Sequence, residues 1–168
     1  MKNSPSRYYK IIHNYQEAQL LFAAIRLNIF SCLDTPATAD MVADALKCDE
    51  EQIELLLLTL TSCGLIGRQG DYYMNTAETK NFLSRSSETF LGDSLLFREK
   101  ITSLSQLDQK IMSPGSVSEP AYDFSEMARM AIPEMYTGRV RAFLNTMTKI
   151  YPDSGRPLRI LDLGGGTG

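Results

Sequence analysis

Apolar side chains recur at three- and four-residue steps near the start of the chain, and this spacing predicts one long helix over residues 6–33. From Leu20 onward a second side of the same helix is also apolar. A helix that is apolar on two sides needs packing partners on both, so we expect a second copy of the chain to cover one of them. The predicted stripe consists of Tyr8, Ile11, Ile12, Tyr15, Ala18, Phe22, Ile25 and Ile29.

Shorter elements with clear start and stop signals follow this helix. Thr38 is placed to cap one helix, and Asp49 followed by Gln52 predicts a capping box at the start of the next, which Gly64 ends. A turn at 69–71 then joins two short β-rich segments. In chain order the pattern predicts a helix over 39–47, a helix from 50 to the glycine at 64, and a hairpin of 65–68 with 72–74. Three helices followed by a hairpin is the layout of a winged helix.

The second half of the chain is predicted to be helical up to a short terminal strand. A proline at 133 predicts a break or kink in the last long helix. The expected elements are helices over 76–83, 89–111 and 123–151, a loop over 113–120, a linker over 152–157 and a strand over 158–163. We therefore expect a mainly α fold with a winged-helix-like domain over 1–112, connecting helices and linker over 113–157, and the start of an α/β domain over 158–168.

The charge distribution argues against DNA binding, which is the main alternative function for a winged-helix protein. The chain has 17 basic and 20 acidic residues, and residues 38–66 hold six acids against the single base Lys47. That region would be repelled by a polyanion, so we expect no nucleic-acid partner. No apolar run is long enough to span a membrane and no secretory segment opens the chain, which predicts a cytoplasmic protein without a membrane contact.

The most specific chemical signal is the end of the chain, where the predicted strand leads directly into glycines at 164, 165, 166 and 168. Glycine permits positive φ and lets a ligand approach where a Cβ would clash. A following helix would direct its N-terminal N–H groups into the same crevice. A nicotinamide or flavin enzyme is a second alternative, although that fingerprint places its third glycine one position later, and spacing alone does not exclude it.

The segment Leu161-Asp162-Leu163-Gly164-Gly165-Gly166-Thr167-Gly168 resembles the first motif of S-adenosylmethionine-dependent methyltransferases with a Rossmann-like fold. Together with the winged-helix layout, the chain is similar to small-molecule O-methyltransferases of plants, fungi and bacteria that form dimers through an N-terminal helical domain. Residues 21–30 resemble the first dimerisation helix of that family. Residues 55–66 resemble its leucine-rich helix, glycine stop and the start of its wing.

The resemblance implies a homodimer that binds S-adenosylmethionine and transfers a methyl group to a small-molecule acceptor, most commonly at a hydroxyl oxygen. It places Asp162 near the methionine amino group of the cofactor, with the glycine loop beneath its methionine and ribose portions. An acid at Phe22 or Ile25 is expected to abolish such a dimer. The implied cofactor-binding residues are Asp162, Gly164, Gly165, Gly166 and Gly168, and the candidate pocket-lining residues are Met127, Met130, Met135 and Tyr136.

Candidate catalytic residues are missing from the pattern. His13 is the only histidine, and it lies beside an apolar stripe where a packing or surface role is expected. No carboxylate pair, metal-ligand cluster or activated nucleophile is visible, so we assign no catalytic and no metal-binding residue. The resemblance places the ribose-binding acid and the catalytic histidine of the family after Gly168. We therefore expect the chain to be the N-terminal dimerisation region of a methyltransferase and to be inactive by itself.

Overall fold

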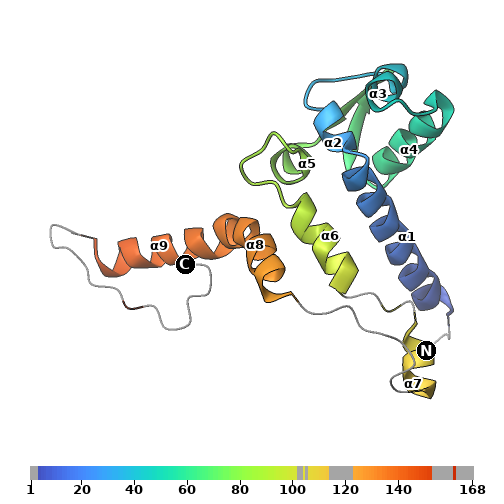
Figure 1. The fold of residues 1–168 in the computed structure, drawn as a ribbon. Coiled ribbons are helices and arrows are strands. Elements are labelled where there is room, and N and C mark those ends of the chain that lie inside the picture. The colour runs from blue at the N-terminus through green and yellow to red at the C-terminus, as the bar shows by residue number, and fades with distance from the viewer. Residues whose placement is uncertain (1–3, 102–103, 105, 114–122, 153–160, 162–168) are drawn as a thin grey trace. The chain divides into compact units, whose positions relative to one another are not determined.

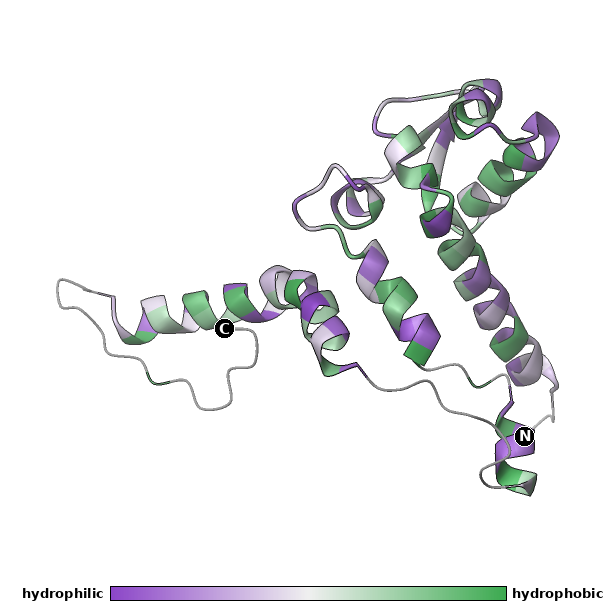
Figure 2. Cartoon of the chain, in the orientation of Figure 1, coloured by the Kyte–Doolittle hydropathy of each residue, from purple (hydrophilic) through white to green (hydrophobic). Residues whose placement is uncertain are grey.

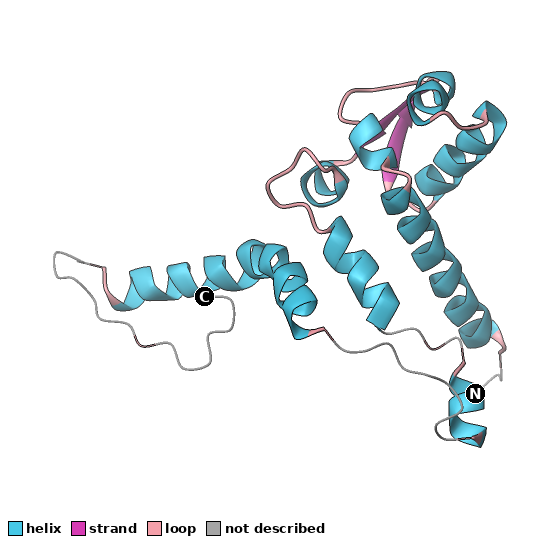
Figure 3. Ribbon diagram, viewed as in Figure 1, coloured by secondary structure: helices cyan, strands magenta, loops and turns pink. Residues whose placement is uncertain are grey.

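The computed structural model describes residues 4–101, 104, 106–113, 123–152 and 161. The chain divides into two compact units, Met1–Gly92 and Asp93–Gly168, each of which is described by itself (Figure 1). Helices predominate in both, and the strands of the described part belong to the first unit (Figure 3). The mainly α fold is thereby confirmed. The predicted strand over 158–163 lies outside the described residues apart from Leu161.

The first unit has the helix and hairpin order of a winged helix, as the sequence predicts. Its two strands are antiparallel, with Ile66 opposite Asn75 and Gln69 opposite Tyr72. Ala37 extends this pairing, because its backbone N–H and C=O bond to Tyr73 at 3.0 and 2.8 Å. The elements are α1 (Ser6–Arg26), α2 (Ile29–Cys32), α3 (Ala39–Leu46), α4 (Glu50–Ser62), β1 (Ile66–Gln69), β2 (Tyr72–Asn75) and α5 (Ala77–Leu83).

The core of this unit is built from one side of each short element. Helix α4 is mostly apolar in its middle, after an acidic start (Figure 2), and its Leu57 and Leu60 are completely buried. Ile25 of α1 is 2% exposed within the single chain. Ile25 is therefore a core residue, and the expectation that it lies at a subunit contact is wrong. Other core side chains are Ala24, Ile29, Phe30, Leu33, Val42, Ile53, Ile66 and Tyr73.

The predicted single helix over 6–33 is interrupted at Asn28. This residue adopts the left-handed conformation, with φ of 61°, and separates α1 from α2. Asparagine tolerates this conformation better than most residues because its short polar side chain bonds locally. Here its Oδ1 accepts a hydrogen bond of 2.7 Å from the Ser31 hydroxyl. No glycine or proline marks the break, and the apolar periodicity continues through it. The sequence pattern therefore gives no sign of the interruption.

The predicted start and end of α4 are confirmed, although only the Asp49 half of the predicted capping box forms, and the predicted cap of α3 is wrong. Asp49 Oδ1 accepts a 3.0 Å bond from the Gln52 N–H and caps α4, while Gly64 follows its end with φ of +72°. Thr38 occupies the N-cap position of α3, but its side-chain oxygen accepts no bond from the helix backbone; its hydroxyl instead donates to the carboxylate of Asp40. A charged acceptor makes the stronger bond, so the carboxylate orients this hydroxyl.

All regular elements in the described part of the second unit are helices. Residues 89–91 precede α6 and are not helical, since the Leu91 N–H donates to the carbonyl of Phe82 at 2.7 Å. Pro133 lies inside α8, and a π-helical segment follows the end of that helix. This change of helix type is the irregularity that the proline predicts. The elements are α6 (Gly92–Ile101), α7 (Leu107–Met112), α8 (Phe124–Glu134), η1 (Met135–Val140) and α9 (Arg141–Ile150).

Candidate functional site

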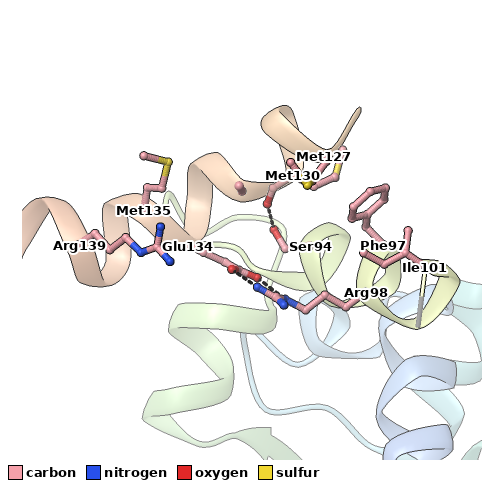
Figure 4. Close-up of a pocket in the computed structure, with 10 residues that line it drawn as sticks. Ser94, Phe97, Arg98, Ile101, Met127, Met130, Glu134, Met135 and Arg139 are labelled. Atoms are coloured by element: carbon pink, nitrogen blue, oxygen red, sulfur yellow. Dashed lines mark hydrogen bonds and ion pairs between the residues drawn. The ribbon is translucent and has the colours of Figure 1, made fainter. Parts of the chain in front are cut away.

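A cavity of about 280 Å³ lies within the second unit, between α6 on one side and α8 with η1 on the other (Figure 4). Its size is close to the lower end of ordinary small-molecule sites. The two sides are far apart in sequence, so the cavity exists only when the helices pair. Its lining consists of Ser94, Phe97, Arg98, Ile101, Met127, Met130, Ala131, Glu134, Met135 and Arg139.

Polar contacts fix α6 against α8 along the cavity. The buried Ser94 hydroxyl donates to the backbone carbonyl of Met130. Arg98 makes a two-pronged ion pair with Glu134, with Nε–Oε1 of 2.8 Å and Nη2–Oε2 of 2.5 Å (Figure 4). Lys100 and Glu126 add a pair at 3.2 Å. Bidentate geometry fixes the orientation of both partners, so these contacts hold the walls of the cavity in place.

The lining suits the binding of a compact, mostly apolar molecule. Three methionines, Phe97 and Ile101 supply polarisable and apolar surface, and thioethers make favourable contacts with aromatic rings. Arg139 contributes a cationic side chain to the same lining. Because Glu134 is held ionised by Arg98, it accepts hydrogen bonds but is a poor proton acceptor near neutral pH. The cavity can therefore bind and orient a ligand without supplying a catalytic base of its own.

The ion pair predicts how the second unit responds to acid. The hydrogen bonds from Arg98 lower the pKa of the Glu134 carboxyl below its usual range. The stabilisation is therefore fully present above the ordinary glutamate pKa of about 4.3 and is lost as the pH falls through the lower value of the folded state. We expect a loss of about 0.2–1 kcal/mol from this half-exposed pair.

Urea unfolding monitored by NMR signals of α8 between pH 6 and pH 2.5 measures this loss. Many carboxylates titrate over that range, so the quantity of interest is the difference between the native chain and Glu134→Gln. The variant should be less stable at pH 6 and should converge with the native chain as the pH decreases. A constant difference across the range would contradict the ionic origin of the contact.

The structure brings three of the four candidate pocket residues to one cavity. Met127, Met130 and Met135 all belong to its lining, whereas Tyr136 is 66% exposed and does not. Phe97 and Ile101 were not predicted to line a pocket, although both lie in the helix expected over 89–111. Apolar side chains at helical spacing indicate which side of a helix is buried, but they do not distinguish a packed core from a cavity wall.

The remaining predicted site residues lie elsewhere. Asp162, Gly164, Gly165, Gly166 and Gly168 are outside the described residues, so their role stays a prediction from the sequence. His13 is exposed on α1. Within the described ranges no group of three or more His, Cys, Asp or Glu side chains lies close enough to hold a metal ion. Nor is any helix of those ranges both long and apolar enough to cross a membrane.

Comparison with known families decides the nature of the first unit. Residues 9–85 match the family model of the O-methyltransferase dimerisation domain. This region is an O-methyltransferase dimerisation domain. It contains the whole winged-helix arrangement from the second turn of α1 to the end of α5, which explains why the helices and the hairpin follow one another in that order.

Individual relatives extend the comparison beyond the dimerisation domain. The N,N-dimethyltransferase OxyT of Streptomyces rimosus is 32% identical over 83 residues, which are 49% of this chain and 24% of OxyT. Human N-acetylserotonin methyltransferase, solved in complex with S-adenosylmethionine, shares the fold with a TM-score of 0.54 and 22% identity over 93% of this chain and 49% of its own.

An O-methyltransferase family protein from Burkholderia thailandensis aligns with a TM-score of 0.60 and 20% identity, over 90% of this chain and 44% of its own. At these identities the solved structures show a shared fold. The chain spans about half the length of these structures and a quarter of OxyT. The dimerisation domain and the helices after it therefore correspond to one part of longer methyltransferases.

Proposed function

We propose that this chain forms the dimerisation and acceptor-facing part of an S-adenosylmethionine-dependent methyltransferase acting on a small molecule. The match of residues 9–85 to the dimerisation domain carries this proposal. The glycine-rich segment that begins at Gly164 supports it, because it resembles the cofactor motif of the same enzymes. When bound, S-adenosylmethionine supplies an electrophilic methyl group on a positively charged sulfur.

The cavity between α6 and α8 is the proposed wall of the acceptor site. Its methionines and Phe97 would hold the apolar body of the acceptor, and the ion pair of Arg98 with Glu134 would keep the walls at a fixed distance. Positioning of the two reactants then contributes to the rate, because a held acceptor reacts as if it were highly concentrated. We propose a hydroxyl oxygen as the methyl acceptor. A nitrogen atom is the alternative, because the relative OxyT is called an N,N-dimethyltransferase.

The proposed partner in solution is a second copy of the chain, contacted through the first half of α1. Every residue from Ser6 to Glu17 is exposed in the single chain, including four apolar or aromatic side chains on one stripe. An isolated helical segment of this length is marginally stable in water, so tertiary or subunit contacts are needed to hold it. The stripe consists of Tyr8, Ile11, Ile12 and Tyr15, with 53–69% of each side chain exposed.

We propose a cytoplasmic protein without a nucleic-acid or membrane partner. The acidic excess around α3 and α4 supports this, because a winged helix that binds DNA needs cations where this domain carries carboxylates. We also propose that the 168 residues alone transfer no methyl group. The described residues of the cavity hold no side chain suited to accept the proton of an acceptor hydroxyl at neutral pH.

Calorimetric titration of the natural polypeptide that carries this chain tests the proposal. We expect it to bind S-adenosylmethionine and not NADH or FAD, and we expect Asp162→Asn to weaken binding about tenfold or more, since it removes a charged hydrogen-bond acceptor. Asp153→Asn makes the same change in the predicted linker and should leave the affinity unaltered. Binding of NADH or FAD without S-adenosylmethionine would reject the methyltransferase.

A further inference from the structure

The cavity between α6 and α8 has a different chemical character at its two ends. Figure 4 shows the apolar side chains of Phe97 and Ile101 at one end of the lining and Arg139 at the other, with the ion pair of Arg98 and Glu134 between them. A ligand that spans the cavity would therefore meet an apolar surface at one end and a guanidinium group at the other.

The lining has one positive charge in excess, because it holds two guanidinium groups and a single carboxylate. Both oxygens of that carboxylate, in Glu134, already accept from Arg98, at 2.8 Å from Nε and 2.5 Å from Nη2. Arg139 takes part in no ion pair within the part of the chain that the structure describes. A carboxylate that is bonded to one guanidinium cannot neutralise a second, so the charge of Arg139 is left for a ligand.

The π-helical segment η1 is the reason that Arg139 reaches this cavity. In an α-helix, residues five positions apart point about 140° away from each other, so Glu134 and Arg139 would lie on different sides. The i→i+5 bonding of η1 instead brings such positions almost into line, and both residues belong to the lining. Segments of this type are rare and often occur at functional sites, which indicates a ligand independently of the charge.

We propose that this cavity binds a small carboxylic acid with an apolar body, whose carboxylate pairs with Arg139 and whose body lies against Phe97 and the methionines. A guanidinium group offers parallel N–H donors that match the two oxygens of a carboxylate. The volume of about 280 Å³ equals that of on the order of ten water molecules, which suits a ligand with about that number of non-hydrogen atoms. This inference rests on the proposed function, for which it names the class of acceptor.

NMR titration of the 168-residue chain without cofactor tests the class of ligand with three probes of similar shape. 4-Phenylbutanoate carries a carboxylate, 4-phenylbutanamide a neutral amide, and 4-phenylbutylammonium a cation. We expect saturable shifts of the Phe97 and Arg139 amide signals with the acid. The amide should bind about fivefold more weakly because it lacks the charge, and the ammonium should bind more weakly still because Arg139 repels it.

Matched variants locate the carboxylate of the ligand. Arg139→Gln should weaken the binding of 4-phenylbutanoate about fivefold and leave the binding of the amide unchanged, since only the acid uses the charge. Arg141→Gln removes the same charge two residues along, outside the lining, and should leave both affinities unaltered. Both arginines are exposed, so both variants are expected to fold, and their NMR spectra check this.

Three results would each overturn the proposal. An absence of saturable shifts with 4-phenylbutanoate would show that the cavity is no site for such an acid. Equal affinity for the acid and either of the other probes would show that the carboxylate is not recognised. Equal weakening by Arg139→Gln and Arg141→Gln would show a diffuse attraction between the acid and a basic surface.

The titration contains no S-adenosylmethionine, so its result is separate from that of the cofactor experiment. If the natural polypeptide failed to bind the cofactor while the chain bound the acid through Arg139, the methyltransferase would be rejected and the carboxylate site would stand. If the cofactor bound and the acid did not, this class of acceptor would be rejected and the methyltransferase would stand.

Discussion

Replacing Leu57 by alanine is expected to destabilise the dimerisation domain by about 2–5 kcal/mol. Leu57 is completely buried in α4, so the substitution loses the transfer free energy of the removed methyl and methylene groups and leaves a cavity behind. A domain of this size has a free energy of unfolding of roughly 5–15 kcal/mol, so this loss is a large part of the total. Urea unfolding followed by circular dichroism at a fixed protein concentration measures it.

Leu55→Ala is the matched control for this prediction. Leu55 lies two residues away on the same helix, but its side chain is 60% exposed. The identical chemical change should therefore alter the free energy of unfolding by no more than about 0.5 kcal/mol. If Leu57→Ala were no more destabilising than Leu55→Ala, the assignment of the buried face of α4 would be wrong.

Ile12→Asp is expected to convert the proposed homodimer into a monomer. Ile12 lies in the middle of the exposed stripe on α1, where a carboxylate in a closed interface would have no partner and would lose its hydration. Central interface positions of this kind contribute about 2 kcal/mol or more, so the dimer should weaken about thirtyfold or more. Sedimentation velocity over a series of micromolar concentrations measures the dissociation constant.

Asn14→Asp is the control for this experiment, because it adds the same acid to the polar side of the same helical segment and should leave the dimer intact. Circular dichroism of both variants checks that each remains folded, which is expected since both positions are exposed in the single chain. A native chain that is monomeric at all concentrations would contradict the proposed dimer. An Ile12→Asp variant that stays dimeric would place the interface elsewhere.

The elements of the dimerisation domain that carry local signals were predicted well. Asp49 caps α4 and Gly64 follows its end because the interactions that start and stop a helix involve residues only a few positions apart. The break at Asn28 was missed because its cause, a left-handed residue bonded to Ser31, leaves the apolar repeat unchanged. Thr38 was predicted as a cap, but its oxygen accepts no bond from the helix backbone and its hydroxyl donates to the carboxylate of Asp40.

The sequence by itself determined the order of helices and hairpin, the acidic character of the domain and the glycine-rich segment after residue 163, since each depends on neighbouring residues. Only the tertiary structure decided which side chains meet. The methionines of α8 line a cavity because Ser94 and Arg98 of α6 bond across to that helix. Tyr73 of the hairpin lies beside Ala37 because the backbone groups of the two residues bond at 3.0 and 2.8 Å. Such contacts join residues distant in the chain, and helical or strand periodicity contains no information about them.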